Sequence, residues 1–429
     1  MSAATTKHDP YAVFRFQSYR DFFWGMFLSQ IGMRIQTIAV GWEVYERTGE
    51  ALALGLVGLV QVVPVIALAL PAGFLADRYP RKTILMFSLV GMTLASICLA
   101  IVSAMDGNIL LMYILLLVDA SMFSLGRPAR MALLPQLVPK RLFSNAVTWN
   151  QSIFQVSMVV GPAIGGYVIL IHPTSSYWLC ALSSVVFFIL SLRIRVMGQP
   201  CTEGVDEDAN KSFFSGPKFV FTTPLLLASL SLDMFAVLLG GAVFLLLIFA
   251  KDILGVGVTG LGWLNTAPAI GALFTTFFIA HASPMRHAGR NMLVAVAGFG
   301  GATIIFGLSQ SFWLSMAMLV LTGVFDTVGV VVRHTIVQLA TPDRMRGRVS
   351  AINSVFISVS NELGGFESGL VAHFFGPVIS VVSGGVGTIV VVLVAAIKSS
   401  SLRRLGSLQD VKPATENEGM DGTVRKSTG

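Results

Sequence analysis

Apolar runs of about twenty residues recur along the whole chain, separated by short polar breaks. A helix needs about 20 mostly apolar residues to cross the hydrocarbon core of a bilayer. The runs are continuous and rich in Leu, Val, Gly and Ala, whereas the strands of a membrane β-barrel would alternate over about ten residues. We therefore predict an all-α membrane protein with twelve transmembrane helices. The predicted helices span residues 22–45, 51–76, 83–104, 108–130, 146–171, 176–195, 222–250, 261–281, 291–309, 312–335, 349–375 and 377–398.

Composition excludes a soluble multidomain protein of this length. The 429 residues are 54% hydrophobic and only 12% charged, whereas a soluble domain carries about 25% charged residues to cover its surface. The three cysteines Cys98, Cys180 and Cys201 show no disulfide framework and no metal-ligand spacing, so no metal site is expected. The polar residues 1–20 lack the apolar core of a signal peptide, so the first helix is expected to direct insertion.

The positive charge of the chain follows a membrane topology. If the N-terminus is cytoplasmic, the outer loops carry only Arg47 and Lys251, and Arg34 lies within the first helix. The other 26 of the 29 Lys and Arg residues then fall on the cytoplasmic side. This is the positive-inside pattern, which predicts two cytoplasmic termini in a bacterial inner membrane. Topology and anionic lipid headgroups explain the net charge of +7, and no nucleic acid is needed as a partner.

A long polar break divides the chain into two halves. We interpret residues 196–221 as a cytoplasmic linker between two six-helix bundles, 22–195 and 222–398. Residues 1–21 are a cytoplasmic N-terminal segment, and the polar tail 399–429 is expected to be disordered.

The two halves resemble each other in sequence. The segment that starts at Pro139 aligns with the segment that starts at Pro342, a spacing of 203 residues. Matches between glycine-rich helices arise often by chance, so the ordered set, rather than any one pair, favours a duplicated bundle. The pairs at this spacing include Arg130 with Arg333, Asn150 with Asn353, Gly161 with Gly364, and Gly166 with Gly369.

The break between the second and third predicted helices carries the sequence GFLADRYPRK, residues 73–82. It resembles the signature G-x-x-x-D-R-x-x-R-[RK] of the major facilitator superfamily. The small Gly73 is expected to permit a close helix contact, and Asp77 suits a neighbouring helix N-terminus. Arg78, Arg81 and Lys82 would hold the cytoplasmic face. The resemblance implies a transporter with two pseudo-symmetric bundles, in which this loop stabilises the outward-open state.

The fifth predicted helix carries GPAIGG. Its residues Gly161, Pro162, Gly165 and Gly166 resemble the core of a motif associated with antiporters of the superfamily. The longer form of that motif has further glycines upstream that this chain lacks. Antiport is one interpretation, and ordinary packing of small residues between helices is the other.

Longer stretches indicate a branch of the superfamily. Residues 41–49, 127–150 and 346–369 resemble the branch that contains the enterobactin exporter and the macrolide-efflux relatives. The resemblance covers about residues 20–398 and marks three arginines near cytoplasmic helix ends. These are Arg127, Arg130 and Arg333.

The chain departs from that branch at two places. It has Gly126 where relatives often carry an acidic residue, so a charge relay from Arg81 is in doubt. Residues 281–291 lack the Asp-Arg pair that a second signature would have, so gating by the first half is expected.

Four charged residues lie within predicted helices that line the central cavity in the resembled fold: Arg34, Asp119, Asp233 and Asp326. Insertion scales give a cost of about 2.5–3.5 kcal/mol for such a group at mid-depth, so it usually faces a cavity or a partner. We hypothesise that Arg34 and Asp233 approach each other and that Asp233 exchanges a proton during transport. A fixed structural ion pair is the alternative.

Two further acids are candidates for coupling. Glu362 and Glu367 lie in the eleventh helix, about 140° apart around its axis, so they cannot share one face. One is expected to face its own bundle and the other a neighbouring helix.

The favoured function is proton-coupled export of an amphipathic small molecule, a drug or a siderophore, by alternating access. The alternatives are a facilitator or importer of the same fold, and a transport-dead sensor or lipid-moving protein. No nucleotide-binding loop, metal cluster or nucleophile constellation is visible in the sequence. We therefore expect no enzyme, no catalytic residue, no cofactor and no nucleotide. A proton gradient is the expected energy source.

Overall fold

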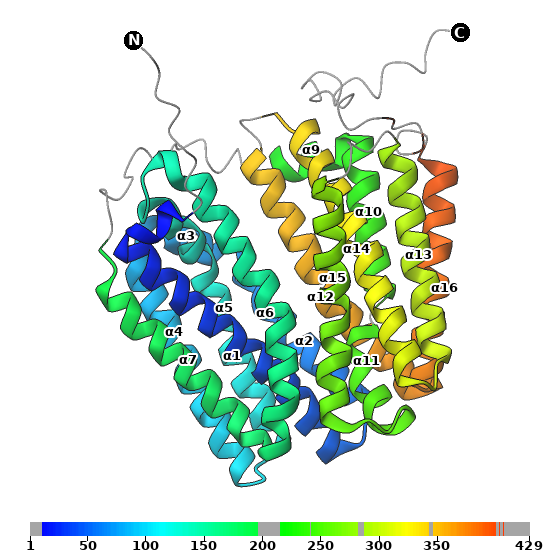
Figure 1. Cartoon of the computed structure of the whole chain (residues 1–429), viewed down its shortest axis with the longest axis horizontal. Coiled ribbons are helices and arrows are strands. Elements are labelled where there is room, and N and C mark those ends of the chain that lie inside the picture. The colour runs from blue at the N-terminus through cyan, green and yellow to red at the C-terminus, as the bar shows by residue number, and fades with distance from the viewer. Residues whose placement is uncertain are drawn as a thin grey trace. The chain divides into compact units, whose positions relative to one another are not determined.

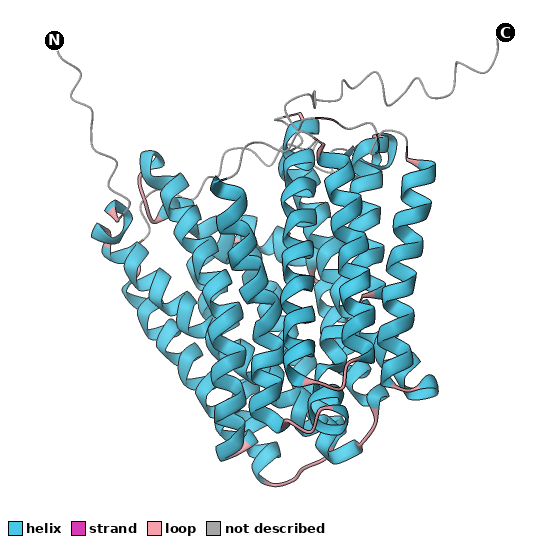
Figure 2. Cartoon of the chain, turned by 45° about the vertical axis from the view of Figure 1, so that its right-hand side comes forward, coloured by secondary structure: helices cyan, strands magenta, loops and turns pink. Residues whose placement is uncertain are grey.

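The computed structural model describes residues 11–195, 215–240, 242–281, 287–342 and 346–399, together with 403 and 406. Within these residues the ordered elements are helices, and no strand occurs (Figure 2). Helix is present in every one of the twelve predicted segments. Eight of the described helical segments are long and apolar enough to cross a membrane.

Two compact units make up the chain. One contains residues Met1–Glu43 and Val63–Cys201, and the other contains Val44–Val62 and Thr202–Gly429. We call them the first and the second unit. The first seven helices (Figure 1) are α1 Gln17–Thr48, α2 Ala51–Ala67, α3 Ala69–Arg78, α4 Arg81–Ala104, α5 Ile109–Leu133, α6 Phe143–Ile171 and α7 Pro173–Arg193. The end of α1 and most of α2 belong to the second unit.

The other helices belong to the second unit. The seventh predicted span, 222–250, is divided by Pro224 at a helix start and by Gly240 at a helix end. Its parts are α10 Pro224–Leu239, α11 Ala242–Ile248 and a π-helical turn, Phe249–Ile253. Before it, α9 Ser215–Thr222 lies almost wholly within the predicted linker 196–221, so the last residues of that linker are helical. The remaining helices are α12 Gly257–His281, α13 Ala288–Leu308, α14 Phe312–Ala340, α15 Arg346–Phe375 and α16 Pro377–Lys398.

Proline explains where the second predicted helix differs from the prediction. The helix expected over 51–76 is broken at Leu68, because Pro71 has no N–H to donate to the carbonyl of Ala67. The predicted loop 73–82 is also mostly helical: α3 runs to Arg78 and α4 starts at Arg81. Pro80 keeps Tyr79 extended, at φ −112° and ψ 157°, and this separates the two helices.

The duplication seen in the sequence is matched by helix positions. Helices α5 and α14 begin 203 residues apart, as do α6 and α15. The last two helices meet at Gly376, which has φ 89° and is followed by Pro377. A positive φ suits glycine, and proline starts the next helix without needing a donor, so this boundary was predictable.

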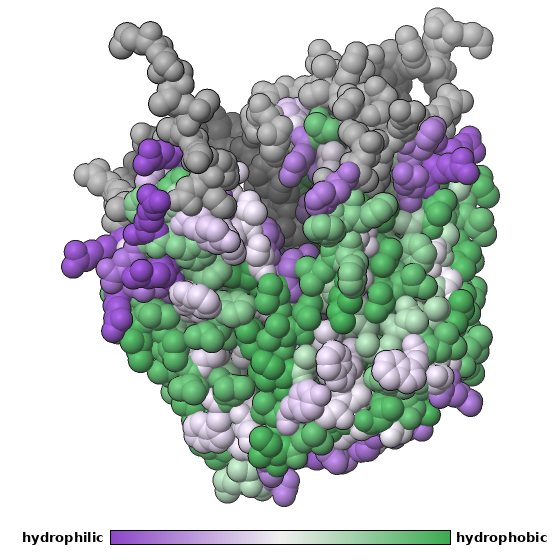
Figure 3. Space-filling model, in the orientation of Figure 1, coloured by the Kyte–Doolittle hydropathy of each residue, from purple (hydrophilic) through white to green (hydrophobic). Residues whose placement is uncertain are grey.

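Small residues bring helices into close contact within the second unit. A methyl group added at Gly271 would overlap the carbonyl oxygen of Val320, and one added at Gly323 would overlap that of Pro268. Helices α12 and α14 therefore cross with their backbones in contact. Hydrophobic residues dominate the visible flanks of the molecule, and hydrophilic ones gather toward the helix ends (Figure 3).

Candidate functional site

A buried ion pair joins two helices of the second unit. Arg333 of α14 bonds through Nη1 to the Oδ2 of Asp233 of α10. The side chain of Arg333 is 3% exposed and that of Asp233 is 11% exposed. The Nε of Arg333 is buried and has no hydrogen-bond partner. A buried charge pair of this kind is strongly destabilised when one partner loses its charge, so protonation of Asp233 would change the interactions of Arg333.

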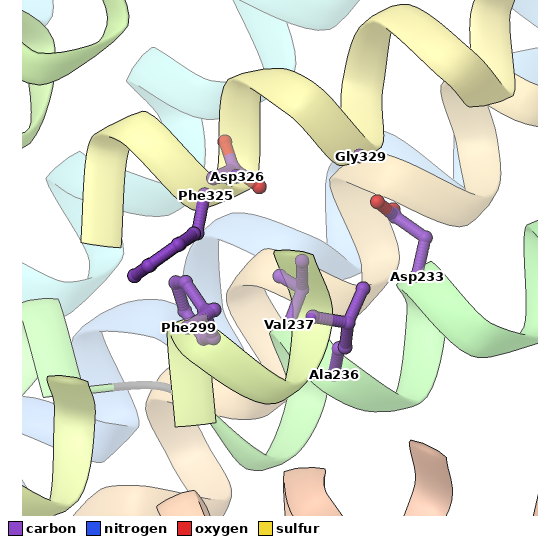
Figure 4. A pocket seen from close by; sticks show the side chains of 8 residues that line it. Asp233, Ala236, Val237, Phe299, Phe325, Asp326 and Gly329 are labelled. Atoms are coloured by element: carbon purple, nitrogen blue, oxygen red, sulfur yellow. The ribbon is translucent and has the colours of Figure 1, made fainter. Parts of the chain in front are cut away.

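A small cavity lies beside this pair. Its volume is about 20 Å³, and Asp233, Phe299, Phe325, Asp326 and Gly329 are among the residues that line it. Figure 4 shows Asp326 with the two phenylalanines toward one end of the cavity and Asp233 toward the other. The structure thus brings two of the four predicted intramembrane charges to one cavity.

A second polar cluster lies in the first unit. Gln36 of α1 donates a hydrogen bond through Nε2 to the Oδ2 of Asp119 of α5, over 3.3 Å. The hydroxyl of Ser96 on α4 donates to the Oε1 of Gln36, over 2.8 Å. The other carboxylate oxygen of Asp119 is buried without a hydrogen-bond partner. Three helices therefore hold one carboxylate, and one of its oxygens remains open to a proton or a donor.

Arg34 packs against the helix that carries GPAIGG. Its guanidinium carbon lies 5.5 Å from the centre of the Phe154 ring on α6. A methyl group added at Gly161 would lie 2.5 Å from the Cβ of Arg34, and one at Gly165 would lie 3.4 Å from the Cα of Ile35. The small residues thus give Arg34 room between α1 and α6.

The ion-pair partner of Asp233 differs from the one that the sequence suggested. Asp233 pairs with Arg333 in its own unit, whereas the hypothesis joined it to Arg34. Arg34 belongs to the other unit, so its approach to Asp233 stays a prediction.

The other two predicted arginines lie on one helix of the first unit. Arg130 is 7% exposed, and its Nη2 donates to the carbonyl oxygen of Phe123 over 3.0 Å. Its guanidinium carbon also lies 4.4 Å from the centre of the Phe123 ring. Arg127, one turn earlier, is exposed. Gly126 faces the Ser88 side chain so closely that any larger residue would displace it.

Two basic residues of the signature motif, Arg81 and Lys82, donate hydrogen bonds to carbonyl groups at helix ends. Arg81 donates through Nη1 to the carbonyl of Ala132 over 2.8 Å. Lys82 donates through Nζ to the carbonyls of Leu192 and Ile194, over 2.9 and 2.8 Å. Both cations thus lie at helix C-termini, where the helix dipole favours positive charge.

Other members of the motif contribute differently. A methyl group added at Gly73 would meet nothing within 4 Å. The expectation of a close helix contact at this glycine is therefore wrong. Arg78 is exposed, and the side chain of Asp77 lies outside the described residues. Pro162 is buried inside α6 together with Gly166.

The remaining acids have different surroundings. Glu362 and Glu367 of α15 are half-buried, and the carboxylate of Glu367 accepts a hydrogen bond from Ser368 over 3.5 Å. Glu43 of α1 is 4% exposed and accepts a hydrogen bond from the hydroxyl of Tyr177 on α7, over 2.7 Å. Within the described residues, no three His, Cys, Asp or Glu side chains form a group that could hold a metal ion.

Sequence reasoning missed two contacts. It named Asp119 but did not give it Gln36 and Ser96 as neighbours, and it named Arg333 without its partner Asp233. The signal was present, because a buried charge needs a buried opposite charge or a donor. What the sequence lacks is the rotation of each helix about its axis.

Comparisons with known proteins agree with this architecture. A family profile described as "Transmembrane secretion effector" matches residues 8–424. The enterobactin exporter of Shigella boydii serotype 18 is 25% identical over 394 residues, which cover 90% of this chain and 93% of that protein. The enterobactin exporter of Escherichia coli O1:K1 is 23% identical over 390 residues, with the same coverage.

Solved structures show the same fold. A bacterial homologue of the human lysosomal transporter Spinster, in an inward-facing and occupied conformation, has a TM-score of 0.70 at 14% identity. The similarity covers 93% of this chain and 99% of that one. A point mutant of the nucleoside transporter NupG has a TM-score of 0.69 at 11% identity, over 89% of this chain and 99% of its own. The chain therefore belongs to the transmembrane secretion effector family of the major facilitator superfamily, whose members are integral membrane transporters rather than enzymes.

Proposed function

We propose that this transporter exports an amphipathic small molecule in exchange for protons. The observation that carries the proposal is the ion pair between Asp233 and Arg333, which is buried inside a membrane-spanning unit. An ionisable residue at this depth usually marks a substrate or proton path. A carboxylate that alternates between a paired, charged state and a protonated state would link proton uptake to rearrangement of the helices.

Asp119 is the corresponding candidate in the first unit. One of its oxygens is buried without a hydrogen-bond partner, so no described side chain would compete with a proton that binds to this oxygen. Gln36 donates to Asp119 and accepts from Ser96, so this chain of hydrogen bonds joins three helices, and protonation of Asp119 would weaken the hydrogen bond from Gln36. We assign Asp119 a supporting role in coupling.

The proposed orientation places both termini in the cytoplasm of a bacterial inner membrane. The distribution of Lys and Arg supports it, because all but three of the 29 fall on one side. Protons would then enter from outside as the substrate leaves. The GPAIGG sequence of α6 supports this direction through its resemblance to the core of an antiporter motif, and its Gly161 packs against Arg34.

The proposed substrate class is an amphipathic organic compound, either a drug or a siderophore. The similarity to proteins named enterobactin exporter supports a siderophore. Aromatic side chains next to charged ones, as at Arg34 and Phe154, suit a molecule with flat apolar parts and a few polar groups.

Dye accumulation in cells that lack their own efflux pumps tests the proposal. Ethidium serves as a cationic dye, and Nile red serves as a neutral one. We expect cells with the protein to accumulate less dye and an uncoupler to remove the difference. Asp233→Asn should accumulate dye like cells without the protein. Asp106→Asn is the control, because Asp106 is an exposed turn residue at φ 47°, a conformation that Asn tolerates.

Other outcomes would point to the alternatives. Unchanged accumulation of both dyes, with the protein present in the membrane, would contradict broad export and leave a narrow substrate such as a siderophore to be tested directly. Higher accumulation with the protein would favour an importer. Accumulation that is lowered but insensitive to the uncoupler would contradict proton coupling.

A further inference from the structure

The second unit contains a row of three residues on one face of a single helix. Asp326, Gly329 and Arg333 follow each other on α14 at spacings of three and four residues, which places them on the same side of the helix. Arg333 reaches Asp233, and both Asp233 and Asp326 line the same cavity. The row therefore joins a second carboxylate to the buried ion pair.

The two carboxylates differ in their access to the surroundings. Asp326 is exposed, although it lies at the midpoint of a helix that is apolar enough to span a membrane. Facing hydrocarbon would cost a charged group about 2.5–3.5 kcal/mol, so we expect the exposed side of Asp326 to face a water-filled path. The side chain of Asp233 is 11% exposed and is therefore much less accessible than that of Asp326. A proton from the water-filled path would thus reach Asp326 before it reaches Asp233.

The cavity between them has the size of a relay site. Its volume of about 20 Å³ exceeds the 10–15 Å³ that one water molecule requires. A water molecule needs two to four polar partners, and the two carboxylates supply acceptors at the two ends of the cavity (Figure 4). Phe299, Phe325 and Val237 close the rest of the wall with apolar groups.

We propose that Asp326 receives the transported proton and passes it to Asp233 through one water molecule in this cavity. The Asp326 carboxyl group gives its proton to the water, and the water gives a proton to the Asp233 carboxylate. One O–H bond breaks and one forms in each transfer, and the water is regenerated. Asp326 becomes negatively charged, Asp233 becomes neutral, and Arg333 loses the opposite charge that held it.

Other charged groups near this path are few. On α14 itself, His334 follows Arg333. Helix α10 also packs against α9, α13, α15 and α16. The described charged or titratable side chains on those helices are Arg290, Glu362, Glu367, His373 and Lys398. Arg290 and Lys398 lie at helix ends, and α15 meets α10 through Gly364, at Val237 and Leu238. Gly364 thus makes the close backbone contact of α15 with α10.

A substitution at Gly329 can displace the water molecule while both acids stay unchanged. It lines the cavity, and a methyl group added to it would meet nothing within 4 Å. The methyl group of alanine at this position would therefore enter the cavity without a clash, and valine would fill more of it. Gly301 of α13 is a matched control, because a methyl group there also meets nothing within 4 Å and the residue is not part of the cavity wall.

The test is infrared spectroscopy of the detergent-solubilised full-length protein after a rapid drop in pH, followed at the C=O band of neutral carboxylic acids. Asp233→Asn identifies the part of the signal that belongs to Asp233. We expect Gly329→Val to slow the appearance of this signal at least tenfold, with its final amplitude unchanged. Asp326→Asn should slow it similarly, and Gly301→Val should leave the rate as in the wild type.

A wild-type rate in Gly329→Val or in Asp326→Asn would overturn the relay. If Gly329→Val does not fold, Gly329→Ala gives the same comparison with one added methyl group. The role of the relay in transport rests on the proposed function, but this experiment needs no substrate. Its failure is therefore distinct from a failure of export, which the dye assay reports.

Discussion

Arg333 and Asp233 form an ion pair between α14 and α10 inside the second unit, with 3% and 11% of their side chains exposed. Each charge is strongly destabilised at such a site when the other is absent. The pair therefore ties the packing of two membrane-spanning helices to the ionisation of one carboxylate, which is the property that a proton-driven transporter requires.

Removing one member of this pair should cost more stability than removing both. Arg333→Leu leaves Asp233 buried without its cation, at an expected cost of about 3–5 kcal/mol. The double variant Asp233→Leu with Arg333→Leu should recover most of this loss, because no unpaired charge remains. Thermal unfolding in detergent measures both. A single variant as stable as the double variant would contradict a charged, mutually dependent pair.

The hydrogen bond between Tyr177 and Glu43 should stabilise the first unit. Tyr177→Phe removes the hydroxyl donor from a buried carboxylate that accepts it over 2.7 Å, and the expected cost is about 1–3 kcal/mol. Tyr167→Phe is the matched control, because the Tyr167 side chain is 52% exposed. Equal melting temperatures for the two variants would show that this hydrogen bond contributes nothing.

Glycines at the crossing of α12 and α14 should not tolerate alanine. Gly323→Ala places a methyl group against the carbonyl oxygen of Pro268, and such overpacking costs about 1–3 kcal/mol. Gly301→Ala meets open space and should gain about 0.5–1 kcal/mol from the better helix propensity of alanine. The two melting temperatures should thus move in opposite directions. A rise for Gly323→Ala would mean that the two backbones are not in contact.

Lys82 should stabilise the C-terminus of α7. Its ammonium group donates to the carbonyls of Leu192 and Ile194, and a cation at a helix C-terminus contributes about 0.3–1 kcal/mol. Lys82→Met should lose this contribution, and the loss should shrink at high salt because the charge is partly screened. Lys82→Arg keeps the charge and should lose less than half of the stability that Lys82→Met loses. A loss in Lys82→Met that is independent of salt would contradict the electrostatic explanation.

The helical architecture was largely predictable from the sequence, because the bilayer sets the length of each apolar run. Proline and glycine also fixed several boundaries, as at Gly376 and Pro377. The break at Leu68 was missed, since Pro71 stands in a run that hydrophobicity alone makes continuous. Local chemistry at a single residue, rather than the pattern of the run, decided that boundary.

The site was predictable in its residue types but not in its contacts. A charge in an apolar helix indicates a functional position, and Arg34, Asp119, Asp233 and Asp326 were found in this way. The pairing of Asp233 with Arg333 depends on how α10 and α14 are rotated about their axes. The sequence also does not show which glycines lie at close helix contacts. A methyl group added at Gly73 would meet nothing within 4 Å, whereas one added at Gly323 would overlap Pro268. Only the crossing points of the helices distinguish them.

The most direct test of the central claim is proton movement during transport in liposomes. Purified protein is reconstituted with ethidium and a pH-sensitive dye inside, and an inward proton gradient is applied. We expect the wild type to release ethidium and acidify the lumen together, and Asp233→Asn to lose at least tenfold in both. Ethidium release and acidification of the lumen at the wild-type rates in Asp233→Asn would contradict coupling through the Asp233–Arg333 pair.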